Sequence, residues 1–265
     1  GQTGCTRCLD LCPTGAIAPD GDHVTVDPMI CAGCGACAAV CPSGAISYDA
    51  PPPATLFQRI HTLASAYREA GGEAPRLLVC DRAFGTELIS LAARFGRGLP
   101  ADVIPLEVDA LSGFGHAEML AALGSGFADV TLLPAPTTER DALDREVPLA
   151  AAIAGEGRIA TLEVNDPDAL CDALYGAGDP PAPCPEPALP MGSRRQVARL
   201  AAKTLHPDPE TVPLPDGAPY GAVLVDTEAC TLCLSCVSLC PSGALVDNPD
   251  MPQLRFQEDA CLQCG

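Results

Sequence analysis

The stretch Cys31–Ile46 reads CAGCGACAAVCPSGAI, with four cysteines at steps of three, three and four and a proline directly after the last. A close copy, GQTGCTRCLDLCPTGAI, opens the chain at Gly1–Ile17, but Gln2 stands where the first cysteine of the pattern would be. A third copy starts at Cys230 and ends in CPSGAL. An internal repeat of this kind indicates a repeated structural unit.

The spacing of the cysteines decides what they bind. Disulfides need an oxidising compartment, and cysteines three apart in a tight turn pair poorly with one another. A zinc site usually takes two separated pairs of ligands. The run C-x₂-C-x₂-C-x₃-C-P is the pattern that binds [4Fe–4S] clusters, and its fourth cysteine serves a neighbouring cluster. We therefore expect thiolate-bound iron–sulfur clusters, with zinc and disulfides as the alternatives. Thirteen of the sixteen cysteines form two terminal blocks: Cys5, Cys8, Cys12, Cys31, Cys34, Cys37 and Cys41, then Cys230, Cys233, Cys236, Cys240, Cys261 and Cys264.

The residues after each block's last cysteine are also shared. Pro13, Pro42 and Pro241 fix φ and remove a backbone donor, so the chain turns away from the cluster. The following glycine allows a turn before a short strand, which we predict over residues 45–48. Residues 22–27 alternate in character and fit the partner strand of a small hairpin.

Residues 1–52 resemble a bacterial-type two-cluster ferredoxin domain, and residues 222–265 resemble the front of a second one. In that family two pseudo-symmetric α+β halves exchange their last cysteines. The resemblance implies a second cluster with Gln2 at the place of one ligand, and an amide oxygen is a poor iron ligand beside thiolates. A [3Fe–4S] cluster, a [4Fe–4S] cluster with a non-cysteine ligand and an effect of the chain boundary all stay open. The implied ligand sets are Cys12, Cys31, Cys34 and Cys37 for the complete cluster, and Cys5, Cys8 and Cys41 for the second.

The C-terminal block implies two further clusters, each lacking ligands. The chain starts without a methionine and stops inside a cysteine motif, so we expect it to be a segment of a longer protein. The ligand sets here are Cys230, Cys233 and Cys236 for the third cluster, and Cys240, Cys261 and Cys264 for the fourth.

The middle of the chain, residues 53–177, predicts a different fold. Short apolar runs alternate with helical patterns, which is typical of βαβ units and an open, mostly parallel α/β sheet of about four strands. Ligands in such sheets bind at the carboxyl ends of the strands, where the candidates are Cys80-Asp81-Arg82, Asp109 with Ser112-Gly113, and Pro134-Ala135. The predicted strands cover residues 76–80, 103–108, 129–133 and 159–164, and the predicted helices cover 54–70, 87–95, 116–123, 138–154 and 166–174.

The middle region also resembles the delta-subunit family of methyl-viologen-reducing hydrogenases, in the order LLVC, PLEVDALSGFGHAEMLAALGSG and ADVTLLPA. In that family the domain relays electrons between a hydrogenase or formate dehydrogenase and a disulfide-reducing flavoprotein, using cysteine-bound iron–sulfur. Only Cys80 sits at a comparable place, so we expect this domain to serve packing and docking. Cys80 and Cys171 are expected to be buried, and Cys184 to have no partner. The four histidines are isolated and are assigned to no metal or catalytic role.

A Pro-rich linker is predicted over residues 178–221. Within it Ser193 caps a helix that runs through Leu205. One face of that helix is basic, and we expect it to be solvated; the alternative is a contact with an acidic module of the same protein. The basic residues are Arg194, Arg195, Arg199 and Lys203.

The net charge of the chain indicates which classes of partner it can bind. The formal net charge of −19 disfavours nucleic acid and anionic membranes and suits a redox protein with a basic docking patch. No apolar run approaches the length of a membrane span. We expect a cytoplasmic electron-transfer protein, without a catalytic site of its own, that relays single electrons through [4Fe–4S] clusters for a redox enzyme. The alternatives are an integral subunit of a formate dehydrogenase or hydrogenase-type complex and a zinc-binding interaction module.

Overall fold

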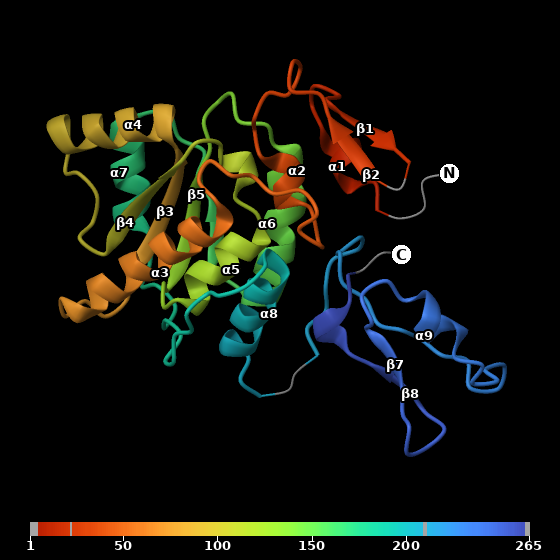
Figure 1. Cartoon of the computed structure of the whole chain (residues 1–265). Coiled ribbons are helices and arrows are strands. Elements are labelled where there is room, and N and C mark those ends of the chain that lie inside the picture. Colours follow the sequence, from red (N-terminus) through yellow and green to blue (C-terminus); the bar gives the residue numbers. More distant parts are fainter. Residues whose placement is uncertain (1–4, 22, 209–210, 263–265) are drawn as a thin grey trace. The chain divides into compact units, whose positions relative to one another are not determined.

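The computed structural model describes residues 5–21, 23–208 and 211–262. The chain divides into two compact units, one built mainly from Thr6–Pro215 and the other mainly from Asp216–Gly265. The first unit combines the N-terminal cysteine block with the α/β region (Figure 1).

The N-terminal block forms two short helices and a hairpin. Helix α1 (Arg7–Leu11) leads into strand β1 (Ile17–Asp20), which pairs antiparallel with β2 (His23–Val26), and helix α2 (Ala36–Ala39) follows. The hairpin predicted around residues 22–27 is therefore present. The strand predicted over 45–48 is wrong: these residues form bends and loop, and β2 pairs with β1 instead. The small apolar core here consists of Leu11, Ala36, Val40 and Ala142.

The α/β region contains the predicted open parallel sheet. Its strand order is β4-β3-β5-β6, and every neighbouring pair is parallel. The chain order reverses between β3 and β5, which makes the carboxyl ends of these two strands the switch point of the sheet. The strands are β3 (Arg76–Asp81), β4 (Val103–Val108), β5 (Asp129–Leu133) and β6 (Ile159–Thr161).

Helices cover both faces of this sheet. Figure 1 shows α4 (Arg82–Phe95) and α7 (Pro167–Gly176) together on one side, and α5 (His116–Gly124) and α6 (Asp141–Ala154) on the other. Helix α3 (Pro53–Glu69) contacts α5, and the short helix η1 (Leu111–Gly113) follows β4. Under α4 and α7 the core includes Cys80 and Cys171, which confirms the prediction that both are buried: Cys80, Cys171, Leu78, Leu88, Val103 and Leu170 pack together there.

The Pro-rich stretch after α7 packs on this unit. The amide of Ala188 donates to the carbonyl of Gly124 at 2.9 Å. Cys184, expected to be without a partner, is buried, and its thiol lies 3.5 Å from the carbonyl of Thr204. The following helix α8 (Arg194–Leu205) packs against α5 and begins at the predicted cap Ser193, whose hydroxyl accepts from the amide of Gln196.

The basic face of α8 differs from the expectation. Arg194 and Arg195 are only 8% and 7% exposed, so the expectation of a solvated face is wrong for both. They are buried because α8 lies flat on α5, and the first turn of α8 therefore faces the interior of the unit. Lys203, nearer the end of the helix, is exposed.

The second unit repeats the local order of the N-terminal block. Helix α9 (Ser235–Leu239) precedes the antiparallel pair β7 (Leu245–Asp247) and β8 (Leu254–Phe256), and η2 (Glu258–Ala260) follows. This unit has little core. Ala244 is buried, whereas Leu224 and Leu239 are 92% and 80% exposed.

Candidate iron–sulfur sites

The cysteine that precedes each proline lies in a turn that points donors at its sulfur. In the first copy the amide of Ala16 donates to Cys12 Sγ at 3.2 Å, and the Thr14 hydroxyl lies 3.7 Å from the same sulfur. In the other two copies a serine stands two residues after the cysteine in place of the threonine, and its hydroxyl also lies 3.7 Å from the sulfur. These pairs are Cys41 with Ser43 and Cys240 with Ser242.

These donors stabilise the thiolate form. Burial raises the pKa of the Cys12 and Cys41 thiols, but hydroxyl and amide hydrogen bonds outweigh burial and leave both values lowered. In the second unit the Leu245 amide and the Ser242 hydroxyl lower the pKa of Cys240 to about 7. Iron is bound by the thiolate, so the chemistry of these turns fits a cluster ligand.

The hydroxyl donors were missed by sequence reasoning. In the shared run after the cysteine, PTGAI, PSGAI and PSGAL, the proline and the glycine alone predict the turn. The signal was nevertheless present, because a small hydroxyl residue occupies the same position in all three copies. Its side chain is short enough to fold back onto the sulfur two residues earlier.

Replacing Thr14 by valine tests this contact. Thr14→Val keeps the side-chain shape and removes the donor to Cys12, so we expect the reduction potential of the cluster bound by Cys12 to fall. The shift should be about 20–60 mV, because one hydrogen bond contributes about 0.5–1.5 kcal/mol and one electron converts about 1.4 kcal/mol to 59 mV. Redox titration followed by EPR measures it. Thr25→Val, on the exposed part of β2, is the matched control and should leave the potential unchanged; equal potentials in both variants would refute the role of the hydroxyl.

The loop from Cys31 to Cys37 gathers the remaining thiols of the complete set. Gly35 adopts φ +73° in the left-handed region, which lets the loop turn into α2. Burial, together with the nearby charges of Cys34, Cys31 and Cys8, raises the pKa of the Cys37 thiol to about 11. The fourth predicted ligand, Cys12, ends α1, and α1 packs against α2. The structure thus brings these segments together.

The C-terminal cysteines are more exposed. The amide of Cys230 donates to the carbonyl of Asp226 at 2.8 Å, as Cys31 does to Asp27 at 3.1 Å, so the two loops start alike. Hydrogen bonds, led by the Ser235 hydroxyl, lower the pKa of Cys233. Cys230, Cys233 and Cys236 are exposed, Cys240 and Cys261 are half-buried, and Gln2 and Cys264 lie outside the described residues.

Within the described ranges no three Cys, His, Asp or Glu side chains converge as ligands of a single metal ion. None of the cysteines that the structure describes forms a disulfide.

The carboxyl edge of the sheet is held by hydrogen bonds of the chain itself. The Asp81 carboxylate, at the end of β3, accepts from the amides of Leu111 at 2.7 Å and Ala135 at 3.2 Å and from the Thr138 hydroxyl. Arg82 pairs with Asp109 at 2.8 Å. The predicted residues at this edge of the sheet therefore lie together, but the polar groups of Asp81 and Arg82 contact other groups of the chain.

The loop from Cys31 to Cys37, here called the first cluster loop, packs on this same carboxyl edge of the sheet. The Ser112 hydroxyl donates to the carbonyl of Cys34 at 2.9 Å. A Cβ added at Gly35 would lie 3.2 Å from the Cα of Gly113, so the two backbones are in close contact. The cluster loop thus lies against η1, at the carboxyl end of the sheet where open α/β folds usually bind ligands.

A set of buried charges lies beside this contact and was missed by sequence reasoning. Glu118 and Glu146 are 3% and 1% exposed, and Arg194 pairs with Glu118. Glu146 accepts from the His116 ring and from the His116 amide, the latter at 3.0 Å. Burial by itself raises the pKa of Glu146, but His116 and Arg194 outweigh burial and lower it. These partners therefore favour the ionised form of the Glu146 carboxylate.

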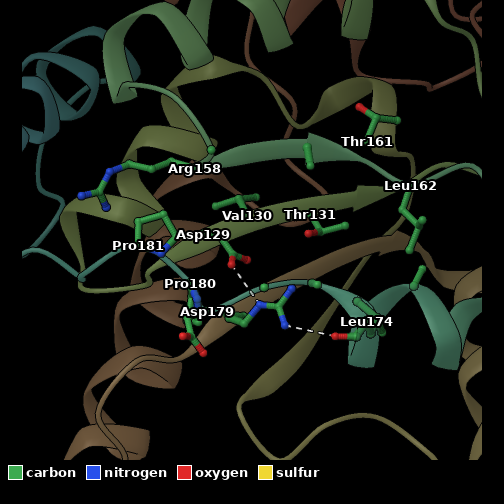
Figure 2. A pocket seen from close by; sticks show the side chains of 16 residues that line it. Asp129, Val130, Thr131, Arg158, Thr161, Leu162, Leu174, Asp179, Pro180 and Pro181 are labelled. Carbon is green, nitrogen blue, oxygen red and sulfur yellow. Dashed lines mark hydrogen bonds and ion pairs between the residues drawn. The ribbon is translucent and has the colours of Figure 1, made fainter.

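A cavity of about 300 Å³ lies elsewhere in the sheet, beside the start of β5 and the end of α7 (Figure 2). At its wall the Arg76 guanidinium donates to the Asp129 carboxylate at 2.9 Å and to the Leu174 carbonyl at 3.3 Å. None of the predicted site residues lines it. Arg76 joins β3, β5 and α7, and we interpret the pair as structural.

Comparison with protein-family models agrees with the cysteine geometry. Residues 3–45 match the 4Fe-4S dicluster domain, and residues 223–246 match the 4Fe-4S binding domain. Both ends of this chain are ferredoxin-type iron–sulfur domains. They bind [4Fe–4S] clusters, and they give the chain an iron–sulfur electron-transfer role. No curated protein and no solved structure matches the chain.

The two matched ranges do not include the middle of the chain, so the resemblance of that region to the hydrogenase delta-subunit family is not supported by them. In the part of the chain that the structure describes, no helix has the length and apolar character needed to cross a membrane.

Proposed function

We propose that this chain relays single electrons between a redox enzyme and its partner through clusters at both ends. The observation that supports it best is the repeated turn with donors aimed at the cysteine sulfur, because hydrogen bonds to sulfur set cluster potentials. The cluster supplies the reversible one-electron chemistry. The protein supplies spacing, burial and hydrogen bonds.

The proposed ligand assignment follows the exchange of last cysteines between halves. Residues 1–52 and 222–265 form the ferredoxin domains, residues 53–177 the α/β domain and residues 178–221 the connecting segment. The cluster beside Gln2 is of the [3Fe–4S] or [4Fe–4S] type. The sets are Cys12, Cys31, Cys34 and Cys37; Cys5, Cys8 and Cys41; Cys230, Cys233 and Cys236; and Cys240, Cys261 and Cys264.

We propose that the partner is a redox protein with a basic docking patch. The net charge of −19 attracts such a surface over a long range and speeds encounter at low salt. Next to the exposed ligand Cys31, Met29 and Ile30 are 89% and 50% exposed. We place the protein in the cytoplasm, because cluster thiols are kept reduced there.

A second candidate is an integral subunit of a formate dehydrogenase or hydrogenase-type complex. The exposed apolar side chains of the second unit, including Leu224 and Leu239, favour it, because permanent interfaces are more apolar than transient ones. The hydrogenase delta-subunit resemblance of the middle region points the same way. In this candidate the α/β domain serves docking.

Anaerobic purification with iron, sulfide and zinc analysis tests the proposal. We expect both iron and acid-labile sulfide, a broad visible absorbance that bleaches on reduction, and EPR signals of the clusters. Colourless, zinc-containing protein would overturn it. Stable co-purification with a large oxidoreductase favours the subunit, whereas a free chain that reduces several acceptors favours the relay.

A further inference from the structure

One buried guanidinium connects the segment after the first cluster loop with the α/β domain. Arg194, in the first turn of α8, donates through Nη1 to the carbonyl of Ala38 and through Nη2 to the carboxylate of Glu118. Ala38 lies in α2, between Cys37 and Cys41. These two cysteines belong to different proposed clusters, so one contact restrains a segment that serves both.

The acceptor carbonyl has a second donor. The amide of Cys41 donates to the same Ala38 carbonyl at 3.3 Å. Arg194 therefore binds the peptide group that also holds the backbone of a cluster ligand. A charged donor forms stronger hydrogen bonds than a neutral one, so this carbonyl has little freedom to rotate.

The surroundings of Arg194 are built to hold it in place. The Gly115 amide donates a hydrogen bond to Glu118 Oε2 at 3.0 Å and so holds this carboxylate in place. A Cβ added at Gly115 would lie 3.0 Å from each of three atoms, namely Arg194 Nη2, Glu146 Oε2 and the Ala39 carbonyl oxygen. Glycine thus allows the start of α5, the guanidinium and the α2 turn to meet at one point.

A contribution to folding stability does not by itself explain why charged side chains are buried here. Desolvating an arginine and two glutamates offsets much of their mutual attraction, and apolar replacements often serve a core equally well. A planar guanidinium with two fixed acceptors is suited to holding two segments in one geometry.

We propose that Arg194 is a positioning residue for the N-terminal clusters, an inference that rests on the proposed function. It fixes the α2 turn between Cys37 and Cys41, and its positive charge favours the reduced state. Loss of Arg194 should loosen this turn, leave the charge of Glu118 uncompensated, lower the reduction potential and speed the loss of iron.

The test compares four variants of the full chain with wild type. Arg194→Met removes charge and donors, and Arg194→Met combined with Glu118→Gln also removes the uncompensated carboxylate. Arg194→Lys keeps the charge but has one nitrogen for two acceptors. Lys203→Met, on the same helix and about 13 Å along its axis, removes the same charge as the matched control.

Three readouts separate positioning from general stability: amide exchange of residues 36–41 by mass spectrometry, cluster potentials by EPR-monitored titration, and the rate of iron loss to a chelator. We expect exchange in this segment to be roughly fivefold to tenfold faster in all three Arg194 variants. Iron loss should accelerate with it. The potential should fall most in Arg194→Met, less in the double variant and least in Arg194→Lys.

Unchanged exchange and potentials in the Arg194 variants, equal to those of Lys203→Met, overturn the inference. If Arg194→Met does not fold, the double variant and Arg194→Lys decide it, because neither leaves an unpaired buried carboxylate. Wild-type chain without iron and sulfide would overturn the proposed function itself, whereas iron-loaded wild type with unaffected variants would overturn only the role of Arg194.

Discussion

Replacing Cys37 by alanine is expected to remove one complete cluster, about four iron atoms per chain. Cys12→Ala should abolish the same EPR signal, although the two residues lie in different sequence copies. Cys41→Ala should leave that signal and affect a different one. The physical reason is the exchange of last cysteines between the halves, because Cys12 and Cys37 then supply thiolates to two iron corners of the same cluster.

Cys171→Ala is the matched control for this series. Cys171 is 3% exposed and its thiol lies 3.5 Å from the Gly98 carbonyl, inside the core under α4 and α7. We expect it to keep the full iron and sulfide content. If Cys12→Ala and Cys37→Ala abolish different signals, the proposed ligand sets are wrong.

The second large effect is expected at Asp81. Asp81→Ala removes the acceptor for the Leu111 and Ala135 amides and the Thr138 hydroxyl at once. The free energy of unfolding should fall by about 3 kcal/mol, because hydrogen bonds to a charged group contribute about 1.5–3 kcal/mol each and the loss is shared among relaxed groups. Denaturant unfolding measures it.

Asp109→Ala supplies the comparison for Asp81. Asp109 is one-third exposed in its side chain and forms an ion pair with Arg82, so its removal should cost less than about 1 kcal/mol. Because Leu111 begins η1, and Ser112 in η1 holds the Cys34 carbonyl, Asp81→Ala should also speed iron loss. Equal unfolding midpoints for the two variants would contradict the assigned role of Asp81.

The regular elements could be predicted from the sequence because each depends on local patterns. The apolar runs 76–80 and 129–133 became strands β3 and β5, and Asp166 caps α7 as expected, accepting from the amides of Asp168 and Ala169. The helix predicted over 87–95 starts earlier, at Arg82, because β3 leads directly into α4. Strand β6 ends at Thr161, short of the predicted residue 164.

The cluster ligands were predictable for another reason, since their spacing along the chain directly reflects the chemistry of the site. The burial of Arg194 could not be predicted from the sequence. The local pattern RRQVARLAAKTL does not indicate that Arg194 contacts Glu118 and the Ala38 carbonyl. Such long-range contacts depend on tertiary packing. For the same reason His116 looked isolated in the sequence, although Glu146 lies beside it.

The link between Ala38 and Arg194 joins residues 156 positions apart in the chain. During synthesis at about 5–20 residues per second, the cysteine turn leaves the ribosome about 10–30 s before its anchoring helix exists. A nascent chain therefore exposes these thiols in a loosely held turn while translation continues. Metal delivery to the first domain should become efficient only once residue 205 has emerged, which makes assembly of this end of the protein a late event.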